Sequence, residues 1–261
     1  MTDGKQKKDL YRMKRSNIYL LFFVIGVFVL SGCGKENDSP VVDSRTEADA
    51  ELPEKDNDLD VKHKVQHFKL DGFSKEGKNT WCLEGDFAKM KNDDILLDTI
   101  TGHSQADDIS VVLTADDGVY ERKTGSVKLT GNVVIVTSDG GKLTMDRANW
   151  SAKSEEVVTD AKVNIVHSGI TVVAVGGMIK PNTQWARLEK NIKVTDSSNR
   201  IITCDGPLEV DYEKHMATFY NNVIITEDQG KISANKVIAY FDPDKKEIVR
   251  IEWVGEVKAV Y

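Results

Sequence analysis

From about residue 113 to its end, the chain repeats one pattern of apolar and polar positions five times. Each copy has an apolar segment, a polar turn, a second apolar segment and a short final segment centred on a Val or Ile, which we call the closing residue. The closing residues are Val133, Val163, Ile192, Val223 and Val257, at spacings of 30, 29, 31 and 34 residues. A period of this length is typical of stacked supersecondary units that pack on their neighbours.

Within each copy, apolar residues alternate with polar ones. Val163 and Ile165 flank Asn164, for example, and Leu143 and Met145 flank Thr144. Because successive side chains of a strand point to opposite faces, the closing residue and the residue two places later share one face. The pattern predicts an all-β protein, whose stacked antiparallel or solenoid-like strands curl around an elongated apolar interior. The inward-facing candidates are Val133, Ile135, Val163, Ile165, Ile192, Val194, Val223 and Ile225.

The sheet begins less regularly at about residue 61, and no segment after residue 33 has a helical period. Alternation is visible in residues 65–70 and 81–88, and shorter apolar runs follow at 95–100 and 109–113. Three Asp-Gly pairs predict turns between later strands, because both residues tolerate the backbone angles that tight turns need. These pairs are Asp117-Gly118, Asp139-Gly140 and Asp205-Gly206.

Residues 1–33 have the features of a bacterial export signal. Six Lys and Arg residues precede an apolar run at residues 18–30, and its 13 residues are short for a bilayer span, which needs about 20. The run ends in Leu30-Ser31-Gly32-Cys33, which resembles a lipobox, so Cys33 is the expected site of lipidation. An uncleaved anchor helix is the alternative interpretation.

Charge divides the chain into a tether and a folded part. Residues 34–60 hold ten acidic residues and three basic ones. They have too little apolar surface to fold, so they are predicted to be an extended tether. The whole chain has a formal net charge of -7. This charge argues against a nucleic-acid partner, because neutralising phosphates needs clustered Lys and Arg.

Few residues suggest chemistry. Cys82 and Cys204 could form a disulfide in an oxidising compartment, but both lie at apolar strand positions, where free thiols behave as small buried hydrophobes. His63 and His67 are four residues apart, a spacing that places two metal ligands on one face of a helix, but alternation predicts a strand there and no third ligand is near. The acidic pairs at 93–94, 107–108 and 116–117 suit turns better than calcium binding or glycoside hydrolysis. We therefore expect no enzyme, metal site or cofactor.

Several segments resemble, in order, the LptC family, the periplasmic membrane-anchored component of lipopolysaccharide export. They are residues 68–70, 81–88 and 113–120 and the motif Leu129-Thr130-Gly131-Asn132-Val133. Residues 217–223 and 248–257 look more like the related OstA-like repeats of LptA. The chain is thus divided into an LptC-like part at 61–195 and additional LptA-like repeats at 196–261, which continue the same sheet. It departs from the family in carrying a lipobox and about two extra repeats.

The resemblance implies an open, twisted β-jellyroll whose apolar groove holds lipid acyl chains. It also implies three partners: lipopolysaccharide, its inner-membrane ABC transporter, and a periplasmic LptA-like bridge protein. On this view the eight inward candidates line the groove. Edge strands would pair with the neighbouring proteins. At the C-terminal edge we expect Trp253, Val254, Val257 and Val260 to form this contact.

Two other functions were weighed against this one. A structural β-repeat lipoprotein would have the same alternation around a closed core without lipid cargo. A carbohydrate-active β-solenoid would need stacked acidic residues, but the equivalent positions hold Asn164, Lys193, Ile224 and Lys258. The expected location is the periplasmic side of the envelope, with a lipid anchor for which function favours the inner membrane and the outer membrane is the alternative.

Overall fold

The computed structural model describes residues 61–73, 79–106, 109–151, 154, 156–180, 185–242 and 248–260. All regular structure in these residues is β, in fifteen strands that form a single sheet. None of the described residues lies in a helix that is long and apolar enough to cross a membrane. The all-β prediction is confirmed.

The strands follow one another with short connections. The first eight are β1 (Val61–Phe73), β2 (Asn79–Lys91), β3 (Asp94–Ala106), β4 (Ile109–Glu121), β5 (Ser126–Thr137), β6 (Lys142–Ser151), β7 (Glu156–His167) and β8 (Ile170–Lys180). The others are β9 (Trp185–Thr195), β10 (Ile201–Cys204), β11 (Leu208–Asp211), β12 (Met216–Glu227), β13 (Gly230–Phe241), β14 (Ile248–Val254) and β15 (Lys258–Val260).

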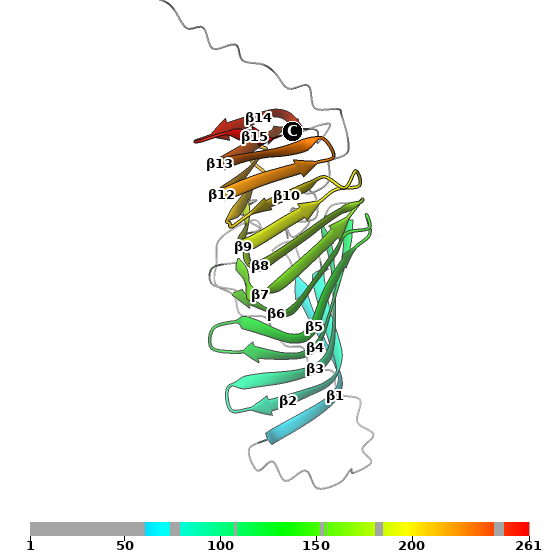
Figure 1. Cartoon of the computed structure of the whole chain (residues 1–261). Coiled ribbons are helices and arrows are strands. Elements are labelled where there is room, and N and C mark those ends of the chain that lie inside the picture. The colour runs from blue at the N-terminus through cyan, green and yellow to red at the C-terminus, as the bar shows by residue number, and fades with distance from the viewer. Residues whose placement is uncertain are drawn as a thin grey trace, which may run out of the picture.

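Each strand pairs antiparallel with its neighbours in sequence, so the sheet is stacked from β1 at one end to β14 and β15 at the other (Figure 1). Two positions in this order are shared. Strands β10 and β11 both lie between β9 and β12, and β14 and β15 both pair with β13. Each of these pairs acts as one long strand that is interrupted near its middle.

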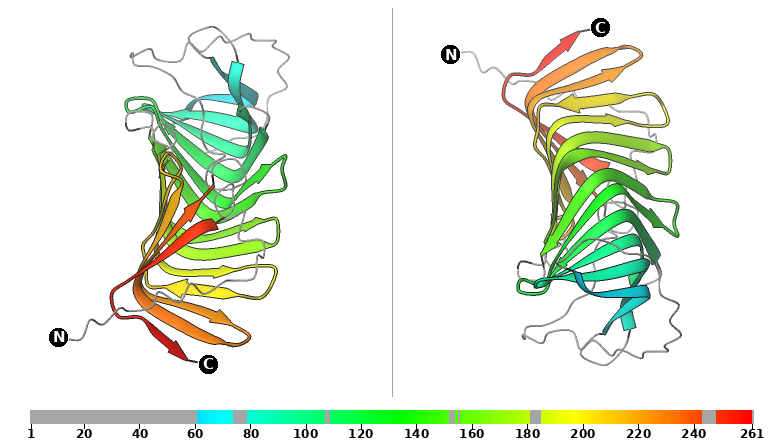
Figure 2. Two further views of the ribbon diagram at one scale, coloured as in Figure 1. Left: turned by 90° about the horizontal axis from the view of Figure 1, so that it is seen from above. Right: turned by 90° about the horizontal axis from the view of Figure 1, so that it is seen from below.

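The other strands bend near their middle as well (Figure 2). The register shifts between Thr130 and Val133 in β5, and Asn132 has a positive φ of 43°. A bulge of this kind bends a strand and increases its twist. The predicted closing residues therefore lie at bends inside long strands rather than at strand ends, and one sequence repeat corresponds to two strands.

The Asp-Gly predictions have mixed outcomes. Asp139-Gly140 forms the turn between β5 and β6, as predicted. Asp205-Gly206 lies at the interruption between β10 and β11, where the strand bends without reversing direction. The prediction for Asp117-Gly118 is wrong, because both residues continue β4 beside its register shift. Asp-Gly suits a bend within a strand as well as a hairpin turn.

The bends divide the sheet into two arms. The first arm runs from the bends to the turns at residues 138–141, 168–169, 196–200 and 228–229. The second arm runs to the opposite set, which includes the turns at 122–125 and 212–215. Residues from the inner faces of both arms form one hydrophobic cluster, in which the first arm contributes Ile165 and Ile192 and the second contributes Leu188 and Leu208. The arms thus enclose the core between them.

Candidate functional site

One row of apolar residues crosses the inner face of the first arm. Hydrogen-bonded pairing brings each member opposite the next, from β2 to β15. At about 4.8 Å between strands, the row extends about 50 Å along the sheet. Its members are Leu83, Gly102, Leu113, Ile135, Leu143, Ile165, Val172, Val194, Ile202, Ile225, Ile232 and Ala259.

All eight residues predicted to face inward are in the hydrophobic core. Ile135, Ile165, Val194 and Ile225 belong to the continuous row, and the other four lie next to the bends of their strands. Their exposed fractions lie between 0 and 5%. Side chains of both arms therefore fill the space beside them, and an acyl chain would need the arms to move apart before it could occupy this space.

A cluster of buried polar side chains lies at the β5–β6 turn, at the free end of the first arm. Thr137 Oγ1 donates a hydrogen bond to Asp139, and His167 Nε2 lies 3.1 Å from Asp139 Oδ2. Thr137 and His167 are only 6% and 5% exposed. Burial alone would raise the pKa of Asp139, but the Thr137 hydroxyl, the His167 charge and the Gly141 N–H lower it below its usual value.

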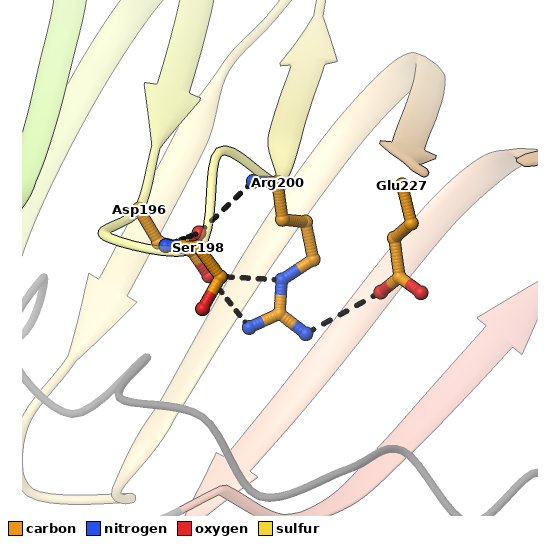
Figure 3. A network of polar contacts seen from close by, with 4 residues as sticks. All are labelled: Asp196, Ser198, Arg200 and Glu227. Atoms are coloured by element: carbon orange, nitrogen blue, oxygen red, sulfur yellow. Dashed lines mark hydrogen bonds and ion pairs between the residues drawn. The ribbon is translucent and has the colours of Figure 1, made fainter. Parts of the chain in front are cut away.

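A second cluster of polar side chains lies at the β9–β10 turn of the same arm (Figure 3). The Arg200 guanidinium donates to Asp196 Oδ2 from Nη2 at 2.7 Å and from Nε at 3.1 Å, and Nη1 lies 3.4 Å from Glu227 Oε1. The Ser198 N–H donates to Asp196 Oδ1 at 2.9 Å. This network closes the polar end of the core. Sequence analysis did not predict either cluster. Their only signal in the sequence was an ionisable residue next to a turn, at a strand position whose side chain points inward.

The C-terminal edge of the sheet consists of β14 and β15. Trp253 is half-buried and packs against the core, whereas Val254, Val257 and Val260 are 44%, 49% and 68% exposed. The Glu256 N–H donates to Asn235 Oδ1 at 2.8 Å and fixes the bend between the two strands. Because the described residues place no strand beyond this edge, its backbone groups are available for pairing.

Other candidate chemistry finds no support from geometry. Both Cys82 in β2 and Cys204 in β10 are free thiols, and eight strand positions separate them, far beyond the Cα separation of about 7 Å that a disulfide permits. His63 and His67 lie in β1. Among the described residues, no group of three His, Cys, Asp or Glu residues could hold a metal ion.

The acidic pairs are in part structural. Asp93 lies in the β2–β3 turn and pairs with Lys123 at 2.5 Å, whereas Asp116 accepts a hydrogen bond from Asn132 Nδ2 at 2.8 Å beside the bends of β4 and β5. The pair at 107–108 lies outside the described residues, as do Cys33, the export signal at 1–33 and the tether at 34–60.

A long single sheet of bent strands around a continuous apolar interior defines a β-jellyroll of the kind suited to shielding an elongated apolar ligand. Comparison with protein families agrees with this class. Residues 19–197 match the family described as lipopolysaccharide-assembly, LptC-related, and residues 206–261 match LptA/(LptD N-terminal domain) LPS transport protein. The chain belongs to the LptC-related family, with an LptA-like C-terminal region. A search of curated proteins finds no match.

Membership gives the chain a role in lipopolysaccharide transport in the periplasm, and the two families are transport and bridge proteins rather than enzymes. The proposed division at residue 195, the lipid anchor and the individual groove and edge residues stay predictions.

Proposed function

We propose that this protein is a membrane-anchored bridge that accepts lipopolysaccharide from an inner-membrane ABC transporter and passes it toward the outer membrane. The acyl chains would travel between the two arms. The observation that carries this proposal is the apolar row that continues from Leu83 in β2 to Ala259 in β15 without a charged residue. An interrupted row would leave part of the path unshielded.

The energetic need for such a path follows from the size of the cargo. Exposing a chain of about twelve carbons to water costs on the order of 10 kcal/mol, at about 0.8 kcal/mol per CH₂. Transport across an aqueous compartment therefore requires continuous shielding rather than catalysis. Since the interior is filled by its own side chains, we propose that lipid entry separates the arms, and that the bends allow this movement.

The handover to neighbouring proteins would use the two edges of the sheet. On this proposal the β1 edge faces the transporter, and the edge at β15 pairs with an LptA-like bridge protein by β-augmentation. The three exposed Val side chains at positions 254, 257 and 260 support the second contact, since a partner strand would cover them. The anchor would be the lipid on Cys33, with residues 34–60 as the tether.

Site-specific photo-crosslinking tests the cargo. A photoreactive residue at Ile165, which is 5% exposed, should give ultraviolet-dependent adducts with lipopolysaccharide in intact cells. The same residue at Asn149, exposed on the outer face of the second arm, should give none. If Ile165 gave no adduct while the protein remained folded, the interior would be a closed core.

That outcome would favour the alternative function, a structural β-repeat lipoprotein without lipid cargo. The tight packing of the eight inward residues, at 0–5% exposure, is the observation in its favour.

A second experiment tests the edge: a chain that ends at Gly255 keeps β14 but loses β15. It should lose binding to the LptA-like partner, and normal binding would exclude β15 as the joint.

A further inference from the structure

Two cross-strand rows on the outer face of the first arm carry lysines but no carboxylates from β4 to β15, and together they define what we call the lysine face. On the other side of β4 the same rows reach Glu84 in β2 and Asp71 in β1. The row nearest the turns is Val112, Val136, Lys142, Val166, Thr171, Thr195, Ile201, Thr226, Lys231 and Val260; the next is Thr114, Val134, Thr144, Asn164, Val173, Lys193, Thr203, Ile224, Ser233 and Lys258.

This composition is unusual for the chain, in which 42 acidic residues outnumber 35 Lys and Arg. The outer face of the second arm has the opposite character, because its cations are paired. Arg147 lies 2.6 Å from Asp160, Lys180 lies 2.6 Å from Glu156, and Arg187 lies 2.9 Å from Glu209. Carboxylates are thus absent from the lysine face and abundant on the outer face of the second arm.

The lysines of the lysine face are largely free of protein partners. Within the described part of the chain, Lys142, Lys193 and Lys231 are exposed and take part in no ion pair, and only Lys258 has one, with Glu256 at 3.0 Å. Their charges are therefore available to an anionic ligand.

A hollow of about 710 Å³ opens at the β9–β15 end of this face. Lys193 and Lys258 line it, together with the hydroxyls of Thr203 and Ser233 and the exposed side chain of Ile224. Asp205 and Glu256 line it as well, and Glu256 pairs with Lys258 at 3.0 Å. Ammonium and hydroxyl groups around one apolar side chain provide donors for phosphate and sugar oxygens and a surface for a sugar ring.

We propose that the lysine face binds the phosphorylated saccharide headgroup of the glycolipid whose acyl chains lie between the arms. This inference rests on the proposed function. A protein with a net charge of -7 would otherwise repel an anionic cargo, and the two rows of the lysine face hold no carboxylate. Lys142 and Lys231, in the row next to the turns, are placed to meet the headgroup first.

Binding of purified lipopolysaccharide to the full chain tests the inference, with dephosphorylated lipopolysaccharide as the second probe. The variant Lys142→Gln/Lys193→Gln/Lys231→Gln should lose about tenfold in affinity for the phosphorylated probe and show a weaker salt dependence. Its affinity for the dephosphorylated probe should be unchanged. The matched control, Lys128→Gln/Lys180→Gln/Lys236→Gln on the second arm, should bind both probes as the unaltered chain does.

Several results would overturn the inference: no loss in the first variant, an equal loss in both variants, or an equal loss for both probes. Stronger binding of the unaltered chain to anionic phospholipid vesicles would make the face a membrane contact instead. Unfolding midpoints of both variants check that they are folded. Photo-crosslinking at Ile165 distinguishes the two proposals. If the binding assay shows no headgroup recognition but Ile165 still forms adducts, only this inference fails. If Ile165 forms no adducts, the transport function fails too.

Discussion

Arg200 holds Asp196 across the β9–β10 turn through three hydrogen bonds, two from its guanidinium to Oδ2 and one from its backbone N–H to Oδ1 at 3.0 Å. The two side chains are 9% and 5% exposed. Asp196→Ala removes these three hydrogen bonds from the buried Arg200, while the contact with Glu227 at 3.4 Å remains, so it should lower the free energy of unfolding by about 3 kcal/mol. Urea denaturation measures this loss.

The matched control is Asp160→Ala. Asp160 forms a two-hydrogen-bond pair with Arg147, but the side chains are 77% and 53% exposed. Such pairs contribute about 1 kcal/mol or less, because water solvates both charges. Equal losses for the two variants would show that burial at the β9–β10 turn does not determine the strength of the pair.

The strands were predictable because their pattern is local. Alternation places Val163 and Ile165 on one face whatever the rest of the chain does, and a period of about 30 residues indicates stacking. The bends were not predictable from the same signals. Asp117-Gly118 has the composition of a hairpin turn, yet β4 continues through it, since Asp116 accepts a hydrogen bond from Asn132 of the neighbouring bend.

The site was predictable only in part, for a related reason. Phase along a strand identifies Ile192 as inward, but it does not say whether the opposite arm fills the space beside it. Burial of His167 depends on packing at the free end of the arm and on the β5–β6 turn, which lies almost 30 residues earlier in the chain. No local pattern contains that information.

Stability should depend on pH through Asp139. Its pKa is lowered in the folded protein, so it stabilises the fold above its unfolded pKa of about 4, and this contribution is lost as pH falls through the lower folded value. We expect Asp139→Asn to cost about 1–2 kcal/mol near pH 6 and progressively less as the pH falls below about 4. Thermal or urea unfolding at several pH values measures the difference. A cost that stayed constant down to pH 2 would assign the effect to shape rather than charge.

Cys82 and Cys204 should differ in reactivity. Burial raises the pKa of Cys204 to about 11, so about one thiol in a thousand is ionised at pH 8. Cys82 is only half-buried. In a Cys33→Ser background, iodoacetamide should therefore label Cys82 well before Cys204, as mass spectrometry would show. In denaturant the two rates should converge, and equally fast labelling of the folded protein would contradict the burial of Cys204.

Close packing at the bend between β10 and β11 should make Gly206 irreplaceable. Its φ is +105°, and a Cβ there would lie 2.2 Å from the backbone oxygen of Glu189 in β9, which cannot move without breaking the sheet. Gly140, in the β5–β6 turn, also has a positive φ of +92°, but a Cβ there would meet no atom within 4 Å. Gly140→Ala should therefore cost only the backbone term of about 1–2 kcal/mol. Gly206→Ala should cost at least about 2 kcal/mol more, measured by urea denaturation. Equal losses of unfolding free energy would mean that the positive φ alone constrains both sites. The contact between the bend and the Glu189 backbone oxygen would then contribute nothing to the cost.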